Sequence, residues 1–281
     1  MLAIEHLLTP FGFDLTKKYK LVRHQDKNYD VQKLYRAGQL EVYQSYQGDP
    51  VFDKCDAIIS FLGSEKNHAL FVGVYWVEGR IDNGIPKLPA DFIYPQMESD
   101  KYYYSLRKDD RFKDLEQRVV IDWGPGALAW VQNFKINHKP VVEVLPPGYV
   151  KEFPGFLNFA LRYDELESIV NNPYANREWH RMLSSVAGVY LILDSANGLQ
   201  YVGSAYGEKG IMGRWKTYVG SGHGGNEQLK ALLAEKPRAE RGFIFSILQT
   251  LPRTLTAKEV VDVEKLYKQK LGSRAHGLNS N

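Results

Sequence analysis

Several features that would place the chain in a common protein class are missing. Cys55 is the single cysteine, which excludes an intramolecular disulfide framework and a zinc site built from several thiolates. No apolar run reaches membrane-spanning length, and the N-terminus lacks a basic segment followed by a long apolar stretch. We therefore expect a soluble protein in the reducing cytoplasm.

Neither sign of charge dominates, because the chain contains 36 Lys and Arg residues and 33 Asp and Glu residues. A net charge of +3 is too small to indicate nucleic-acid binding by itself. The charge is unevenly distributed. Residues 187–281 hold 13 basic and 8 acidic residues, a net of +5. Subtraction from the totals of 36 and 33 leaves 23 basic and 25 acidic residues in residues 1–186, a net of −2. The excess positive charge therefore lies in the C-terminal third.

Aromatic residues are abundant, with 18 Tyr and 5 Trp. Such side chains serve cores, interfaces and base-stacking surfaces alike. A chain of 281 residues with 44% hydrophobic content is long enough for two domains, each with its own core.

The first half reads as a small mixed domain around a curved sheet or barrel. Residues 30–46 have apolar positions typical of helix, although Gly38 weakens one continuous helix. Four runs rich in β-branched and aromatic residues then predict strands: "CDAIISFLG", "HALFVGVYWVEG", "QRVVIDWG" and "KPVVEVLPP".

Residues 163–182 turn polar and helical, and we place the domain boundary here, giving domains 1–175 and 176–281. The second domain is predicted to hold strands at 188–193, 199–204 and 241–248 and helices near 211–219 and 226–234. A final helix begins at the capping box of Thr256 and Glu259 and ends before Gly272. The fold class is therefore α+β.

Two tyrosines stand eleven positions apart in "GVYLILDSANGLQYVGSA", on two predicted strands joined by a turn. Each alone is typical of sheet packing. Arg214, Tyr218, Glu264 and Asn279 follow them in order, and with "GVY" (188–190) and "YVG" (201–203) this set resembles the GIY-YIG nuclease family over residues 186–281. The resemblance implies a small antiparallel sheet flanked by helices.

The resemblance also implies a phosphodiesterase site. Glu264 would hold one Mg²⁺ or Mn²⁺, which accepts a carboxylate plus water and phosphate oxygens. Arg214 would bind phosphate through its planar, permanently charged fork. Tyr190 would position or deprotonate the water, and Tyr201 and Tyr218 would line the site. A free tyrosine has a pKa of about 10, so a base role needs nearby positive charge.

Two further residues are candidates for substrate binding. They are His223, in the glycine-rich segment "GSGHGGNEQL", and Asn279. This segment lacks the spacing and the terminal Lys-Ser/Thr of a P-loop, so no nucleotide cofactor is expected. Ordinary alternatives stay open: Glu264 with Lys268 as a helix ion pair, Arg214 as a solvated cation, Asn279 in a frayed tail and His223 as a loop histidine.

The first domain contains a weaker signal. The run "HALFVGVYWVEG" after "AIISFLG" resembles PUA-like domains, a superfamily that includes readers of modified bases. This resemblance implies that a flipped base could stack on one of four aromatic residues, namely Tyr46, Trp76, Trp123 and Trp130. The alternative is that all four are core aromatics.

Three functions remain open at this point. The first is a restriction endonuclease, of type II or modification-dependent, whose residues 1–175 recognise double-stranded DNA. The second is a repair or recombination nuclease that selects branched or damaged DNA, and the third is an inactive DNA-binding protein. We favour the first, with a homodimer on DNA, because cutting both strands generally takes two single-site domains. No membrane partner is expected.

Overall fold

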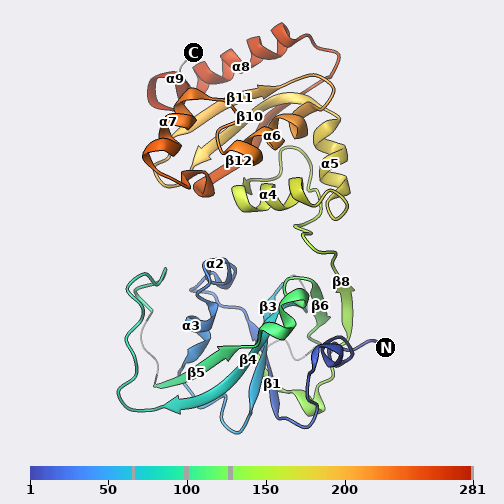
Figure 1. Ribbon diagram of the computed structural model, residues 1–281, viewed down its shortest axis with the longest axis vertical. Helices are drawn as coiled ribbons and strands as arrows, with labels where there is room; N and C mark the ends of the chain where they lie inside the picture. Colours follow the sequence, from blue (N-terminus) through green and yellow to red (C-terminus); the bar gives the residue numbers. More distant parts are fainter. Residues whose placement is uncertain (65–66, 98–100, 126–128, 280–281) are drawn as a thin grey trace. The chain divides into compact units, whose positions relative to one another are not determined.

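The computed structural model describes residues 1–64, 67–97, 101–125 and 129–279. The chain divides into two compact units, Met1–Leu145 and Pro146–Asn281, and each has its own β-sheet and helices (Figure 1). The fold is mixed α+β, as the sequence predicts. None of the helices in the described ranges is long and apolar enough to cross a membrane.

Within the described ranges, the N-terminal unit is built on a curled eight-stranded sheet. Six strands follow the order β2-β5-β4-β3-β1-β7, and β6 pairs with both β4 and β8. Strand β1 runs parallel to β3, whereas the other pairs are antiparallel. The strands are β1 (Tyr19–His24), β2 (Tyr46–Gln47), β3 (Ala57–Gly63), β4 (His68–Ile81), β5 (Tyr102–Lys108), β6 (Val119–Asp122), β7 (Val131–Asn133) and β8 (Val141–Val144).

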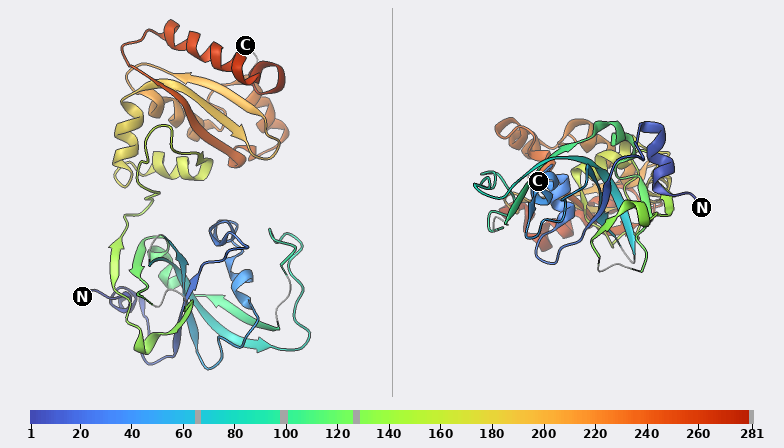
Figure 2. Two further views of the ribbon diagram at one scale, coloured as in Figure 1. Left: turned by 180° about the vertical axis from the view of Figure 1, so that it is seen from behind. Right: turned by 90° about the horizontal axis from the view of Figure 1, so that it is seen from below.

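The long strand β4 accounts for the curl of this sheet. Its first residues pair with β6, its middle with β3 and its last residues with β5. Two register shifts interrupt this pairing, one opposite Ser60 and Phe61 and one between Val77 and Gly79. Bulges of this kind bend and twist a strand, and Figure 2 shows the resulting curvature. The curved sheet expected for this half is therefore confirmed.

Short helices surround the N-terminal sheet. They are α1 (Ile4–Leu8), η1 (Thr9–Phe11), α2 (Val31–Arg36), α3 (Leu40–Ser45), η2 (Asp110–Leu115) and η3 (Phe134–Ile136). The helical signal at residues 30–46 is thus two helices, because Gly38 adopts the left-handed conformation between them with φ of +70°. The four predicted strands are present as β3, β4, β6 and β8.

Four strands of this unit, β1, β2, β5 and β7, were not predicted from the sequence. Strand β1, "YKLVRH", has polar residues among its apolar ones and gives no clean alternation. It is nevertheless buried almost throughout, including Arg23 and His24, because it lies between β3 and β7. Its polar side chains are held by tertiary neighbours that a local pattern does not reveal.

Among the described residues, the C-terminal unit contains a four-stranded antiparallel sheet in the order β11-β10-β12-β9. The strands are β9 (Leu161–Arg162), β10 (Ala187–Asp194), β11 (Gln200–Ala205) and β12 (Phe243–Leu251). The helices are α4 (Tyr163–Asn171), α5 (Arg177–Ser184), α6 (Gly210–Ser221), α7 (Glu227–Glu235), η4 (Ala239–Gly242), α8 (Ala257–Leu271) and α9 (Ser273–His276). The strands and helices predicted after residue 186 are therefore all present, with Thr256 capping α8.

Alternation along β10 sends successive side chains to two different cores. Tyr190 and Ile192 pack with α4, α5 and α6 on one face. Val189 packs with Val260 of α8 on the other face, and Figure 1 shows α8 lying along β11 and β10. The sheet is therefore sandwiched between helices, as the family resemblance implied.

The compact C-terminal unit begins at Pro146, earlier than the expected boundary at 175/176. Helices α4 and α5 look polar in sequence, yet each buries an apolar stripe in this unit's core. Trp179 of α5 is fully buried, makes an edge contact with Phe153 and donates its indole N–H to the Lys151 carbonyl at 2.7 Å. The preceding segment thereby belongs to the C-terminal unit.

The register of β10 and β11 explains the spacing of the two tyrosines. Tyr190 lies opposite Gly203, and Tyr201 lies opposite Ile192, so both rings occupy the same face. A Cβ at position 203 would lie 2.4 Å from the Tyr190 hydroxyl oxygen. Gly203 therefore provides the space in which the Tyr190 ring lies.

We expect Gly203→Ala to lower the free energy of unfolding of the C-terminal unit by at least about 1–3 kcal/mol, the usual cost of overpacking. Gly220→Ala is the matched control, because this exposed helical glycine has open space around it, and we expect a gain of up to about 1 kcal/mol. Urea unfolding of both variants measures the difference. Equal stability of the Gly203 variant and the wild type would contradict this account of the glycine.

Candidate active site

Three tyrosines from three elements form a triangle of rings in the C-terminal unit. Tyr190 comes from β10, Tyr201 from β11 and Tyr218 from α6. Their ring centroids are 6.0 Å apart between Tyr190 and Tyr218, 6.3 Å between Tyr201 and Tyr218, and 6.5 Å between Tyr190 and Tyr201. Tyr190 and Tyr218 are fully buried, and their hydroxyl oxygens lie 3.0 Å apart.

Arg214 ties this cluster together. Its Nε donates to the Tyr190 hydroxyl at 3.2 Å and its Nη2 to the Tyr218 hydroxyl at 3.3 Å. Its Nη1 donates to the Gly224 carbonyl at 2.8 Å, and the guanidinium carbon lies 4.9 Å from the Tyr218 ring centroid. The spacing of four residues on α6 places Arg214 and Tyr218 on the same face of that helix. The guanidinium is therefore held in one orientation before any substrate arrives.

The surroundings keep the two buried phenols protonated. Burial raises the pKa of Tyr190 above that of a free tyrosine, and the charge and hydrogen bond of Arg214 only partly offset this. Burial raises the pKa of Tyr218 as well. At neutral pH both side chains are hydrogen-bonding phenols.

Glu264 approaches from the opposite face of the sheet, on α8. Its carboxylate accepts a hydrogen bond from the Ser204 hydroxyl on β11. Its Oε1 lies 2.7 Å from Nζ of Lys268, and only 14% of the glutamate side chain is exposed. The Lys268 pair that the sequence suggested is present, and the same carboxylate also lines a pocket.

This pocket, of about 660 Å³, lies over the edge strand β11, with α6 on one side and α8 on the other. It brings together Tyr201, Arg214 and Glu264 of the sequence-predicted set. Tyr190 and Tyr218 lie behind its wall. The residues that line it are Tyr201, Ser204, Ala205, Tyr206, Lys209, Gly210, Gly213, Arg214, Thr217, Val261 and Glu264.

Two predicted substrate-binding residues do not line this pocket. The Asn279 side chain is 3% exposed and binds the main chain of Val202, accepting from its N–H at 2.9 Å and donating to its carbonyl at 2.8 Å. It fastens the end of the chain to β11 beside Tyr201. His223 lies in the loop after α6, where its Nδ1 accepts from the Gly225 N–H at 2.9 Å.

Sequence reasoning missed several residues that line the pocket. Ser204 and Lys209 contribute polar groups that no motif marked, and Thr217 adds a hydroxyl. The sequence did contain one signal for Ser204. Alternation along "YVGSA" places the side chains of Tyr201 and Ser204 on opposite faces of the strand. A site that uses both residues must therefore lie at the edge of the sheet. The position of β11 at the edge was not readable from the sequence.

The residues present fit a cation that needs few protein ligands. Among the described residues no group of three or more His, Cys, Asp or Glu gathers around a common point. Glu264 offers one hard carboxylate in a pocket that is open to solvent and to a phosphate. This donor set suits Mg²⁺ or Mn²⁺, which complete their coordination with water and substrate oxygens, and does not suit structural zinc.

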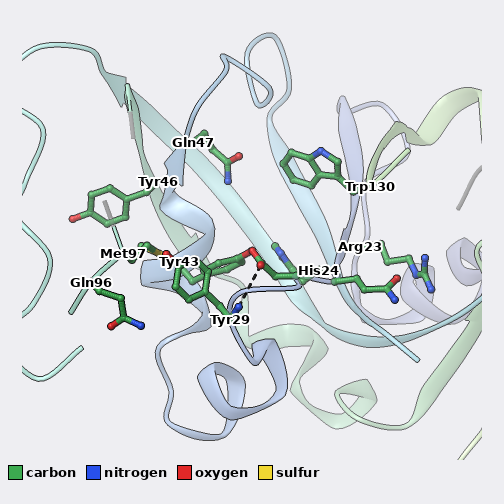
Figure 3. A pocket seen from close by; sticks show the side chains of 11 residues that line it. Arg23, His24, Tyr29, Tyr43, Tyr46, Gln47, Gln96, Met97 and Trp130 are labelled. Atoms are coloured by element: carbon green, nitrogen blue, oxygen red, sulfur yellow. Dashed lines mark hydrogen bonds between the residues drawn. The ribbon is translucent and has the colours of Figure 1, made fainter. Parts of the chain in front are cut away.

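The four aromatic candidates of the N-terminal unit have different surroundings. Trp123 is 1% exposed and belongs to the core, so it presents no face to a base. Trp76 packs against the same core and donates its indole N–H to Asp109 at 2.9 Å. Tyr46 is only 4% exposed and Trp130 is 40% exposed, and both line a second pocket of about 530 Å³ (Figure 3).

Comparisons with known proteins find matches to part of the C-terminal unit. A family model described as "GIY-YIG catalytic domain" matches residues 186–279. The catalytic domain of the homing endonuclease I-TevI matches with 26% identity over 33% of this chain and 96% of that domain, at a TM-score of 0.26. A mutant of the catalytic domain of the intron endonuclease I-TevI matches with 23% identity over 34% of this chain and 94% of that domain, at a TM-score of 0.28.

A comparison with curated proteins finds no match. The assignment therefore rests on the family model and on the ordered residues that the fold gathers at β11. Residues 186–279 form a GIY-YIG domain, and the chain that carries it is a nuclease.

Proposed function

We propose that this chain is a metal-dependent DNA endonuclease of the restriction kind, in which the N-terminal unit recognises the target and the C-terminal unit cuts it. The observation that carries the proposal is the pocket at β11, where Tyr201, Arg214 and Glu264 converge. Phosphodiester hydrolysis needs a held phosphate, a positioned water and neutralisation of negative charge. The pocket contains residues suited to all three.

Each residue has a defined task in this proposal. Arg214 binds a non-bridging phosphate oxygen and stabilises the charge that grows there, because its orientation is already set by two phenols and a carbonyl. Tyr201 faces the pocket and orients the attacking water. Glu264 holds the cation, which when bound supplies further positive charge for the phosphate and the departing oxygen.

Charge is divided between the units in a way that supports this assignment of roles. Residues 1–145 hold 19 basic and 20 acidic residues, a net of −1, and subtraction from 36 and 33 leaves 17 against 13, a net of +4, in residues 146–281. The cutting unit thus supplies most of the attraction to the phosphate backbone. A nearly neutral recognition unit is compatible with base readout, which depends on specific contacts to base edges.

A repair or recombination nuclease is the second candidate. Its partner modules often bind zinc, and the single cysteine of this chain gives that alternative no support. A double-strand cut would require two copies of the C-terminal unit on one site, so we propose a homodimer or a transient pair on DNA.

We expect Glu264→Gln to reduce the divalent-cation-dependent rate of DNA cleavage by on the order of 10³-fold or more, because the amide removes the charge that attracts the cation. DNA binding should be retained. Glu259→Gln is the matched control on the same helix, since a glutamine preserves the capping box of Thr256. A Glu264 variant with full activity would disprove its assignment as the metal ligand.

Arg214→Lys should lower the single-turnover cleavage rate by on the order of 10²-fold, because an ammonium group cannot hold two phenols and a carbonyl and still face the phosphate. Arg253→Lys, at an exposed position outside the pocket, controls for the substitution itself. If both variants cut DNA at the wild-type rate, another cation holds the phosphate.

The target class can be read from the products. Incubation of the protein and Mg²⁺ with unmodified, 5-methylcytosine and 5-hydroxymethylcytosine phage DNA, followed by sequencing of the ends, should give discrete cut sites on at least one of them. Addition of EDTA should stop the cutting. Cleavage confined to branched or damaged substrates would instead favour the repair alternative.

A further inference from the structure

The pocket of the N-terminal unit has no role in the chemistry at β11 and is built from four separate segments. Strand β1 and the loop after it contribute Arg23, His24 and Tyr29, and the end of α3 and strand β2 contribute Tyr43 and Gln47. Gln96 and Met97 form a third segment of the lining, and Trp130, just before β7, is the fourth. Figure 3 shows the aromatic and amide side chains gathered around one opening.

The walls of this pocket are aromatic. Trp130 is 40% exposed although it is among the largest apolar side chains of the chain. Tyr43 and Tyr29 form a second aromatic surface, with ring centroids 6.3 Å apart. Exposed aromatic faces of this kind attract planar ring systems, and stacking on them does not require a charged ligand.

The base of the pocket is polar and preorganised. His24 is 4% exposed, and its Nε2 lies 3.0 Å from Oε1 of Gln44, which also accepts from the Ser60 hydroxyl at 2.8 Å. An amide oxygen only accepts, so Nε2 of His24 carries the proton and its Nδ1 is the acceptor. Burial lowers the pKa of His24 to about 4, which keeps the ring neutral at neutral pH.

Gln47 adds a second fixed group. It is 9% exposed, and its Nε2 donates to the Gln44 carbonyl at 2.9 Å, which directs the amide and leaves its Oε1 as an acceptor. The carboxylate of Asp26 is held by the Tyr43 hydroxyl at 2.7 Å. Among the described lining residues, Arg23 is the cation and Asp26 the anion, so their charges balance. The pocket therefore suits a neutral ligand with hydrogen-bonding edges.

This composition differs from that of another pocket in the same unit. A smaller pocket of about 260 Å³ beside Cys55 is lined by four lysines, namely Lys18, Lys20, Lys54 and Lys135, and would attract an anion. The lysine-lined pocket suits a phosphate group, whereas the aromatic pocket suits a base.

We propose that the pocket around Trp130 takes one base of the target DNA, rotated out of the duplex, with Trp130 stacking on its face and His24 and Gln47 hydrogen-bonding to its edge. The inference rests on the proposed function, because it assumes that the N-terminal unit meets DNA. Every base has a planar ring and a polar edge, which are the features that the pocket can bind. Inside a duplex the ring faces are stacked, so a protein reaches both the face and the edge only when the base is rotated out. A free nucleoside shares this chemistry, and the experiment separates the two sources.

The test uses the full chain carrying Glu264→Gln, so that the DNA is not cut. Short duplexes carry the mapped target with one position occupied in turn by each base, 5-methylcytosine or 5-hydroxymethylcytosine, either paired or opposite an abasic site. Extruding an unpaired base costs less free energy. For at least one base we expect about tenfold or more tighter binding of the unpaired duplex.

Variants of the stacking residue assign this preference to the pocket. Adding Trp130→Ala should reduce the difference in binding between unpaired and paired duplexes to within about twofold. Trp130→Phe should retain most of this difference because a stacking face remains. Leu15→Ala, an exposed apolar side chain of the same unit outside the pocket, should leave it unchanged.

The outcomes keep the two proposals apart. Equal binding of paired and unpaired duplexes for every base, or a preference that survives Trp130→Ala, overturns the base pocket but leaves the endonuclease assignment intact. Binding of free deoxynucleosides without any preference for unpaired duplexes also overturns it, in favour of a soluble ligand. Failure of the wild-type protein to bind or cut any DNA overturns the proposed function itself.

Discussion

The half-buried guanidinium of Arg214 lines the pocket and is held by acceptors from three parts of the C-terminal unit. Its partners are the phenols of Tyr190 and Tyr218 and the carbonyl of Gly224. Each must come from a different place: β10, the next turn of α6, and the loop that follows α6. Loss of any one would remove an acceptor that fixes the orientation of this half-buried, charged group. The cluster therefore determines where strand, helix and loop meet.

The edge position of β11 determines how the rest of the site is assembled. Because β11 has a neighbouring strand on one side only, residues from both faces of the sheet can meet at its open edge. Helix α6 brings Arg214 from one face and α8 brings Glu264 from the other. Ser204 and Tyr201, on opposite faces of β11, meet the two helices. Asn279 satisfies the main chain of Val202 on this strand, so the end of the chain secures the wall of the pocket.

The two units use aromatic residues in different ways. In the C-terminal unit Tyr190 and Tyr218 are fully buried, and their hydroxyl groups accept hydrogen bonds from the Arg214 guanidinium. In the N-terminal unit Trp130 is exposed and Tyr43 and Tyr29 form a surface over a neutral histidine. The high aromatic content of the sequence is consistent with both uses, and only the burial of each side chain distinguishes them.

The sequence by itself indicated the main strands and helices from β10 to α8 and the candidate site residues, because strand alternation, the Thr256 capping box and the order from Tyr190 to Glu264 are local or ordinal signals. It did not determine β1, whose polar residues are accommodated by neighbours, or the start of the second unit at Pro146, where polar helices hide apolar stripes. Nor did it separate the buried Trp123 from the exposed Trp130, or show that Asn279 binds Val202. Those outcomes depend on contacts between residues far apart in the chain, and such contacts form only when the chain is folded.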